Sequence, residues 1–166
     1  MAILANARVK SFEKRTCMSV QYLHGDLTLD GADIIVNPVN AIGIMGKGVA
    51  LAFKNRWPEI MSEYRRSCMT GQINPGSCVL FQHPDAPTTR FWAALATKGH
   101  WKEPSRYEWI ESGLKELATR AHSVNAETVA IPMVGCGNGG LDWNRVRPMI
   151  LTIMSEFDLH IYGTTL

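Results

Sequence analysis

The sequence predicts an α/β fold with a mixed, largely parallel sheet that is covered by helices on both faces. Strand-like apolar runs alternate along the chain with segments of helical periodicity. Residues 34–36 form a short, wholly apolar run between turn signals, which is typical of a central strand buried on both faces. A length of 166 residues suits one domain, and a hydrophobic content of 46% excludes a disordered chain.

Five further segments show strand patterns. Val20 and Tyr22 alternate with polar neighbours and predict a half-buried strand. Apolar runs predict four more strands at residues 78–81, 91–96, 128–133 and 159–162.

Helical periodicity lies between these strands. A helix over residues 49–57 ends before Pro58, which is itself suited to the first position of a second helix. The second helix has an apolar stripe at spacings of three and four, formed by Trp57, Met61, Tyr64 and Cys68.

Two more helices follow in the second half of the chain. Ser105 and Glu108 have the spacing of a capping box, in which Ser105 would cap the third helix. The stripe of this helix contains Tyr107, Ile110, Leu114, Leu117 and Ala121. A last helix over residues 142–156 contains Pro148, which either kinks it or starts its regular part.

Several classes of protein and of site are disfavoured. No run approaches the roughly 18–20 apolar residues of a membrane span, and no signal peptide is recognisable, so we expect a cytoplasmic protein without a membrane partner. The four cysteines contain no C-x-x-C pair, which predicts free thiols and no metal site. Residues 1–17 are basic and aperiodic, and we expect them to be an extension of uncertain structure that precedes a domain at 18–166.

Two glycine-containing loops occupy equivalent places, each between a predicted strand and a predicted helix. The first covers residues 37–48 and the second residues 135–140. Glycine lets backbone N–H groups approach a ligand, and a helix N-terminus favours an anion. For either loop alone, tight turns are the favoured explanation, but two such loops on adjacent strand ends predict a site for a diphosphate.

Two common phosphate motifs fit less well. The segment around Gly46 and Lys47 lacks the spacing and the Ser or Thr of a phosphate-loop NTPase. Gly135, Gly137 and Gly140 match the dinucleotide fingerprint, but at the end of the chain rather than at the start of a Rossmann domain. A dinucleotide oxidoreductase is therefore a weaker alternative.

Several motifs in order resemble the macrodomains, the modules that bind ADP-ribose. They are HGDL at 24–27, ADIIVNPVN at 32–40 and IPMVGCG at 131–137. MGKGVA at 45–50, ATK at 96–98 and GNGGLDW at 137–143 further resemble the DarG-type DNA ADP-ribosyl glycohydrolases. The resemblance implies a macrodomain-like three-layer α/β/α sandwich.

The resemblance also implies roles for individual residues. Asp26, with Leu27 beside it, would accept a hydrogen bond from adenine, although a turn or cap acid is the simpler interpretation of Asp26. Asn40, a catalytic candidate together with Lys98, and Thr97 would face the distal ribose, and Asn37 would brace the loop at the ligand. The residues that would surround the diphosphate are Gly48, Val49, Ala50, Gly135, Cys136, Gly137, Asn138, Gly139 and Gly140.

Lys98 corresponds to the catalytic lysine of this branch. A neutral amine would attack C1″ of the distal ribose and open the sugar ring to an imine. This needs a lowered pKa, either from partial burial or from a nearby cation, and Lys102 is near in sequence. The alternatives are a charged lysine that stabilises the leaving group, or an ordinary surface lysine. The second loop contains no acid to assist Lys98, since Asp142 is expected to be a helix N-cap. Trp101 would either stack on an unpaired base or pack under its loop.

The function implied by the resemblance is removal of ADP-ribose from thymidine in single-stranded DNA. Such an enzyme acts as antitoxin to a DarT-type transferase and needs no cofactor, with ADP-ribose as its product. The competing interpretations are an ADP-ribose-binding module without activity and an ADP-ribose 1″-phosphate phosphatase.

Overall fold

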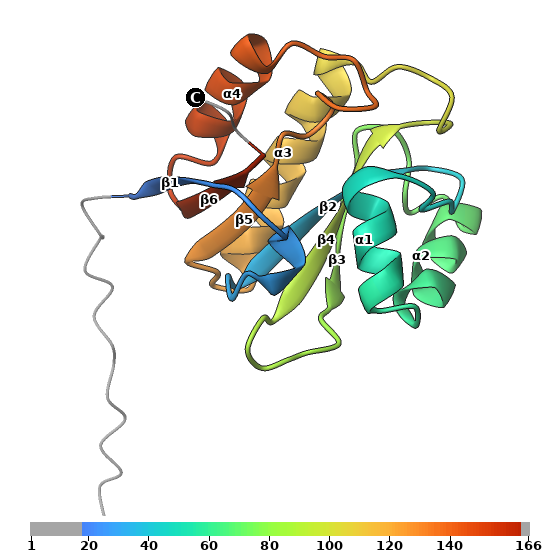
Figure 1. Ribbon diagram of the computed structural model, residues 1–166, viewed down its shortest axis with the longest axis horizontal. Coiled ribbons are helices and arrows are strands. Elements are labelled where there is room, and N and C mark those ends of the chain that lie inside the picture. Colours follow the sequence, from blue (N-terminus) through green and yellow to red (C-terminus); the bar gives the residue numbers. More distant parts are fainter. Residues whose placement is uncertain (1–17, 164–166) are drawn as a thin grey trace, which may run out of the picture.

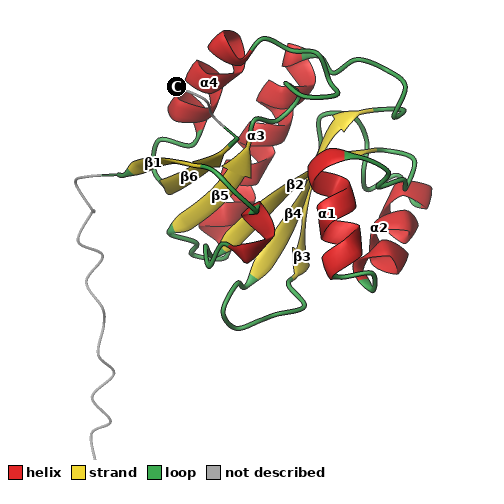
Figure 2. Cartoon of the chain, in the orientation of Figure 1, coloured by secondary structure: helices red, strands yellow, loops and turns green. Residues whose placement is uncertain are grey.

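The computed structural model describes residues 18–163, and the predicted extension at 1–17 lies outside them. Six strands form one sheet in the order β1-β6-β5-β2-β4-β3, in which only the β3–β4 pair is antiparallel. Helices cover both faces of this sheet, so the predicted three-layer α/β/α architecture is confirmed (Figures 1 and 2).

All six predicted strands and four predicted helices are present. The elements are β1 (Val20–Leu23), the short 3₁₀ helix η1 (Leu27–Leu29), β2 (Ile34–Asn40), α1 (Gly48–Arg56), α2 (Ile60–Met69), β3 (Cys78–Gln82), β4 (Phe91–Lys98), α3 (Tyr107–Ser123), β5 (Thr128–Pro132), α4 (Trp143–Ile153) and β6 (Asp158–Tyr162). No helix of the described residues is long and apolar enough to cross a membrane.

The core is divided in two by the sheet. Ile34 and Val36 pack with α3 and α4 on one face, whereas Ile35 packs with α1 and α2 on the other. Successive side chains of a strand point to opposite faces, so a run that is apolar at every position has to lie in the middle layer. The interpretation of residues 34–36 as a central strand is therefore confirmed.

Strand β2 is longer than the sequence predicted, because residues 37–40 continue it instead of starting the glycine loop. β2 pairs with β4 up to Asn40, whereas its pairing with β5 covers only Ile34 and Ile35. Pro38 lacks an N–H donor, which discourages a central-strand assignment from sequence. Here only one neighbouring strand accompanies the half of β2 that contains the proline.

Two helix starts differ from their predictions. The capping box at Ser105 is wrong, because α3 begins at Tyr107 with Arg106 as its N-cap, and no side chain caps it. Ser105 is instead buried, and its N–H donates to the carbonyl of Gly139. Pro58 lies in the turn just before α2, which begins at Ile60, and is not the first residue of the helix. By contrast, Asp142 accepts a hydrogen bond from the N–H of Asn144, so its prediction as an N-cap is confirmed.

Asp33 ties together the amino ends of the three central strands. Its carboxylate accepts hydrogen bonds from the N–H groups of Glu127 and Thr128, just before and at the start of β5, and from Nε of Arg90, just before β4. Burial opposes ionisation of Asp33, but these donors outweigh it and hold the pKa of the carboxyl below its ordinary value. The ionised carboxylate therefore stabilises the folded protein.

Replacing Asp33 by Asn should lower the free energy of unfolding at neutral pH by about 1–3 kcal/mol, because charge-assisted bonds are lost. A lowered pKa means that the contribution is present above the unfolded pKa of about 3.9 and disappears as the pH falls below it. Urea unfolding at pH 7, 5, 4 and 3 should show the gap between wild type and Asp33→Asn closing toward low pH. Glu108→Gln, on the exposed face of α3, is the control; a constant gap would contradict the assignment.

Candidate functional site

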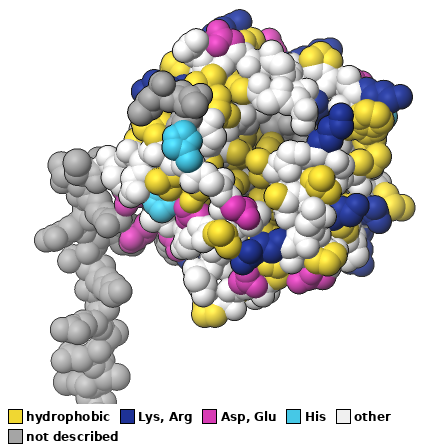
Figure 3. All heavy atoms as spheres, viewed as in Figure 1, with side chains coloured by type: hydrophobic (Ala, Val, Ile, Leu, Met, Phe, Trp, Pro, Cys, Tyr) yellow, Lys and Arg dark blue, Asp and Glu magenta, His cyan; other side chains and the backbone are white. Residues whose placement is uncertain are grey.

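The loops that follow β2, β4 and β5 meet at one edge of the sheet and surround a cleft of about 1360 Å³. Figure 3 shows this hollow, with apolar side chains inside it and Lys or Arg side chains at its edge. In an open α/β sheet, ligands bind outside the carboxyl ends of the strands. The cleft is thus where the sequence predicted a site, and it is large enough for a nucleotide-sized ligand.

The first glycine loop brings the N-terminus of α1 to the cleft. Gly48, Val49 and Ala50 line it at the first turn of α1, and Gly48 has a φ of 58°, in the left-handed region that favours glycine. Lys47 is the N-cap residue and lines the cleft as well, but its side chain does not cap the helix. The first turn therefore presents free N–H groups and a positive charge to the cleft.

The second loop uses its glycines in different ways. A Cβ at Gly139 would overlap Oγ of Ser105 and the carbonyl oxygen of Gly135, so no side chain fits there. A Cβ at Gly137 would have no atom within 4 Å, and the φ of Gly137 is not positive. The turn therefore does not require glycine at position 137, whereas a side chain there would project into the cleft.

The outer end of this loop is a turn. Gly135 to Gly139 line the cleft, whereas Gly140 does not. Gly140 has a φ of 75°, and its N–H donates to the carbonyl of Gly137 at 3.2 Å. The predicted contact of Gly140 with a ligand is not supported by this position.

Lys98 is the last residue of β4, which extends two residues beyond the predicted strand at 91–96, and its side chain lies between two loops. Nζ donates to the carbonyl of Asn138 at 2.7 Å and to the carbonyl of Trp101 at 3.4 Å. Partial burial, and then the charge of Lys47, lower the pKa of Lys98. The predicted effect of a neighbouring cation thus comes from Lys47 and not from Lys102, which extends over the Trp101 ring at 5.0 Å.

Asn40 performs the bracing that the sequence assigned to Asn37. Its Nδ2 donates to the carbonyl of Ile44 at 2.7 Å, and its Oδ1 accepts from the N–H groups of Ile42 and Ile44. Asn37 is fully buried outside the cleft, and its Nδ2 contacts Sδ of Met45. Asn40 also lines the cleft, as does Thr97, which a register shift between β2 and β4 leaves without a partner residue.

Tyr64 is a residue of this site that sequence reasoning interpreted only as core. Its buried hydroxyl donates to the backbone carbonyl of Asn40 at 2.7 Å and to Oδ1 of Asn40 at 3.0 Å. Nε of Arg65 donates to the carbonyl of Gly43 in the same loop. The helical stripe in the sequence shows that Tyr64 is buried, but nothing in it shows what the hydroxyl contacts.

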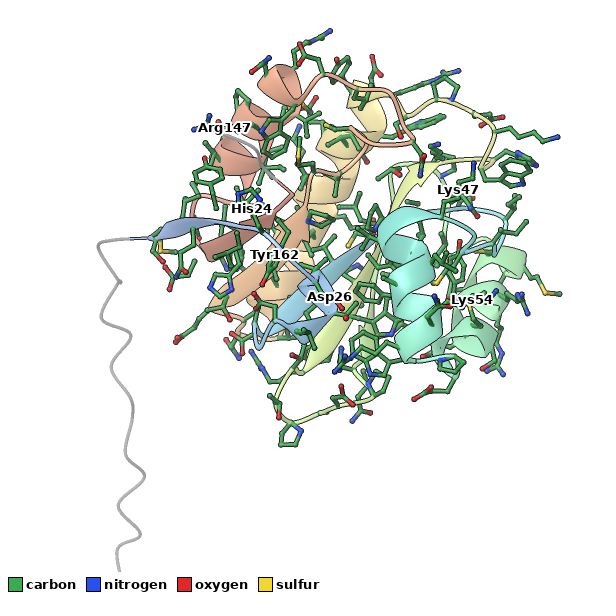
Figure 4. All side chains as sticks on the ribbon, in the orientation of Figure 1. His24, Asp26, Lys47, Lys54, Arg147 and Tyr162 are labelled. Carbon is green, nitrogen blue, oxygen red and sulfur yellow. The ribbon has the colours of Figure 1, made fainter. Side chains whose placement is uncertain are left out.

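The far end of the cleft contains Asp26, Leu27 and Tyr162, across from Lys47 (Figure 4). Oδ1 of Asp26 accepts from the N–H and the hydroxyl of Thr28 and caps η1, so the cap interpretation is confirmed. Oδ2 has no hydrogen-bond partner among the described residues, which leaves an acceptor for a ligand. The hydroxyl of Tyr162 donates to Asp30 at 2.7 Å, which orients this ring at the wall of the cleft.

Among the residues that the structure describes, no group of three or more His, Cys, Asp or Glu side chains is arranged to hold a metal ion. The cleft instead offers backbone N–H groups, three lysines at one end and a carboxylate at the other. Such a site suits an elongated ligand with a central anion and a hydrogen-bond donor at one end.

Comparison with known proteins agrees with this geometry. The family model described as Macro domain matches residues 36–150. A relative from Thermus aquaticus named DNA ADP-ribosyl glycohydrolase is 37% identical over 131 residues, which are 79% of this chain and 36% of the relative. The chain therefore spans little more than a third of the length of this relative.

Solved structures show the same fold. The macrodomain of Mycobacterium tuberculosis DarG superposes with a TM-score of 0.84 and 33% identity, over 90% of this chain and all of that one. Thermosipho africanus DarTG, solved in complex with ADP-ribose, superposes with a TM-score of 0.81 and 25% identity, over 88% of this chain and 42% of that one. The family-model match over residues 36–150 and the superposition on the DarG macrodomain show that this chain belongs to the Macro domain family.

Proposed function

We propose that this protein binds ADP-ribose in the cleft and removes it from thymidine in DNA in the cytoplasm, as antitoxin to a DarT-type transferase. The observation that carries the proposal is Lys98, whose amine lies in the cleft beside both glycine loops and has a lowered pKa. Relatives named DNA ADP-ribosyl glycohydrolase, and the DarTG structure with ADP-ribose, support the choice of substrate and partner.

The proposed orientation of ADP-ribose follows from the chemistry of the two ends. Oδ2 of Asp26 is suited to accept a hydrogen bond from the adenine amino group. The N-terminus of α1 and the backbone at Gly137 are suited to the diphosphate. This orientation directs the distal ribose toward Asn40, Thr97 and Lys98.

In the proposed reaction, neutral Lys98 is the nucleophile. Its amine attacks C1″ of the distal ribose, the bond from C1″ to the thymidine base breaks, and the base takes up the proton that the amine loses. The C1″–O4″ bond then opens, with the second amine proton passing to O4″, which leaves an imine between lysine and C1″. Water adds to this imine, the bond from C1″ to the lysine nitrogen breaks to restore the amine, and the sugar ring closes as ADP-ribose is released. Burial and the charge of Lys47 favour the neutral form that this step needs. No cofactor takes part.

Replacing Gly137 by Val should abolish ADP-ribose binding without unfolding the protein, because the new side chain would project into the cleft from an unstrained backbone. Calorimetric titration with ADP-ribose measures the affinity, and the melting temperature without ligand checks the fold. Gly31→Val is the matched control, since Gly31 is equally open and lies outside the cleft. Unchanged affinity in Gly137→Val would contradict the diphosphate site.

Replacing Lys98 by Ala should retain ADP-ribose binding but reduce release of ADP-ribose from a modified thymidine oligonucleotide by orders of magnitude. Lys98→Arg should be as inactive, because it keeps the charge but not a nucleophilic amine. An active Lys98→Arg would instead assign Lys98 an electrostatic role. Wild type that binds ADP-ribose but cleaves neither this oligonucleotide nor ADP-ribose 1″-phosphate would be a binding module.

Replacing Lys47 by Gln should move the rising limb of the pH–rate profile to higher pH. Removal of the Lys47 charge raises the pKa of Lys98, so the neutral amine becomes abundant only at a higher pH. Single-turnover rates between pH 6 and 10 measure the limb. Lys54→Gln, on the exposed side of α1, is the control (Figure 4). A rising limb at the same pH in Lys47→Gln would show that Lys47 does not affect the ionisation of Lys98.

A further inference from the structure

Exposed apolar side chains gather beside the Lys98 end of the cleft. The described residues include six large hydrophobic side chains that are exposed, namely Val20, Leu29, Ile42, Ile44, Met69 and Trp101. Ile42 and Ile44 lie in the loop after β2, and Trp101 lies in the loop after β4. The two loops adjoin, because the N–H of Ala41 donates to the carbonyls of Lys98 and Gly99.

Lysines accompany these apolar groups. Lys47 and Lys102 line the same end of the cleft as Ile44 and Trp101. We call these residues, together with Ile42, the rim. Asp26, at the other end, is the one acidic residue among the described residues that line the cleft. Glu103 lies in the Trp101 loop, but its Oε2 accepts the N–H of His100.

The backbone around Trp101 is held in place although its side chain faces solvent. The Trp101 carbonyl accepts from Nζ of Lys98, and Nδ1 of His100 accepts from the N–H of Lys102 at 3.1 Å. Trp101 is nevertheless 45% exposed, so the alternative in which it packs under the loop is wrong. Its ring stacks on His100 and lies beside Lys102. An exposed indole with a cationic neighbour is typical of a binding surface.

We propose that the rim binds the unpaired base next to the modified thymidine in single-stranded nucleic acid, with Trp101 as the stacking surface. The inference rests on the proposed function, in which the bond to be cleaved lies near Lys98. A chain attached at that bond has to leave the cleft over the rim. A base stacks on the indole, in exchange for the contact of Lys102 with the Trp101 ring. Lys47 and Lys102 are suited to the flanking phosphates.

The rim fits a polynucleotide better than a peptide that carries ADP-ribose. Each nucleotide adds one flat ring and one phosphate, which correspond to the aromatic and cationic groups of the rim. Stacking does not depend on the identity of the base, so the rim should favour unpaired strands over duplexes without reading sequence.

The test compares kcat/KM for a short ADP-ribosylated thymidine oligonucleotide with kcat/KM for the ADP-ribosylated mononucleoside. Wild type should prefer the oligonucleotide, and Trp101→Ala should reduce this ratio roughly 5- to 100-fold. Trp101→Phe should recover part of the ratio. A general loss of activity would lower both rates and leave the ratio unchanged.

Trp109→Ala is the matched control. Trp109 also has a cationic neighbour, with Arg106 4.9 Å from its ring, but it does not line the cleft. Its ratio should equal that of wild type. Lys102→Gln should reduce the slope of oligonucleotide affinity against salt concentration by about one.

A second measurement does not require turnover. Unmodified single-stranded oligonucleotide should bind wild type more tightly than Trp101→Ala in fluorescence anisotropy, and a duplex of the same length should show no such difference. Equal oligonucleotide affinities of wild type and Trp101→Ala, or a kcat/KM ratio unaffected by Trp101→Ala, would overturn the proposed role of the rim. The proposed glycohydrolase activity would not be contradicted. If kcat/KM for an ADP-ribosylated peptide fell as strongly in Trp101→Ala, the choice of nucleic acid as the partner would be overturned. If the oligonucleotide binds in a Trp101-dependent manner but no turnover is detected, the proposed function alone is contradicted.

Discussion

The carboxylate of Asp33 joins the amino ends of β2, β4 and β5 through donors from Arg90, Glu127 and Thr128. β2 pairs in parallel with both β4 and β5, so the carboxyl ends of all three strands lie at the opposite edge of the sheet. Both glycine loops and Lys98 follow or end these strands. One ionised side chain at the edge opposite the cleft thus supports the geometry on which the cleft depends.

The cleft is made largely of backbone. Gly139 packs too closely on Gly135 and Ser105 to accept a side chain, and this contact gives the second loop its shape. Gly137 is left open toward the cleft, where a ligand can approach the N–H groups. Asn40 and Tyr64 hold the first loop by hydrogen bonds, so contacts within the protein support the shape of both loops.

Lys98 connects these loops to the proposed chemistry. Its hydrogen bonds to the carbonyls of Asn138 and Trp101 orient the amine, while burial and Lys47 lower its pKa. Carbonyl acceptors hold an amine in either protonation state, because a neutral amine still donates. The same bond to Trp101 connects the amine to the proposed nucleic-acid rim.

The sequence by itself determined the order of strands and helices, the buried central strand at residues 34–36 and the equivalence of the two glycine loops. Hydrophobic periodicity and the Gly and Pro residues that end helices and strands are local features, so they can be identified from one sequence. The motif resemblance added the Macro domain family and the interest in Lys98, which composition alone would have left as a surface lysine.

Tertiary structure alone decided how those residues are used. It continued β2 through Pro38, moved the helix start away from Ser105, assigned the bracing of the loop to Asn40 and made Lys47 the cation beside Lys98. Each of these results depends on a partner far away in the chain, such as β4, Gly139 or Tyr64. Spacing along a sequence predicts which face a residue occupies, but hydrogen bonds and electrostatic fields depend on distances in space, which only the packed sheet and loops set.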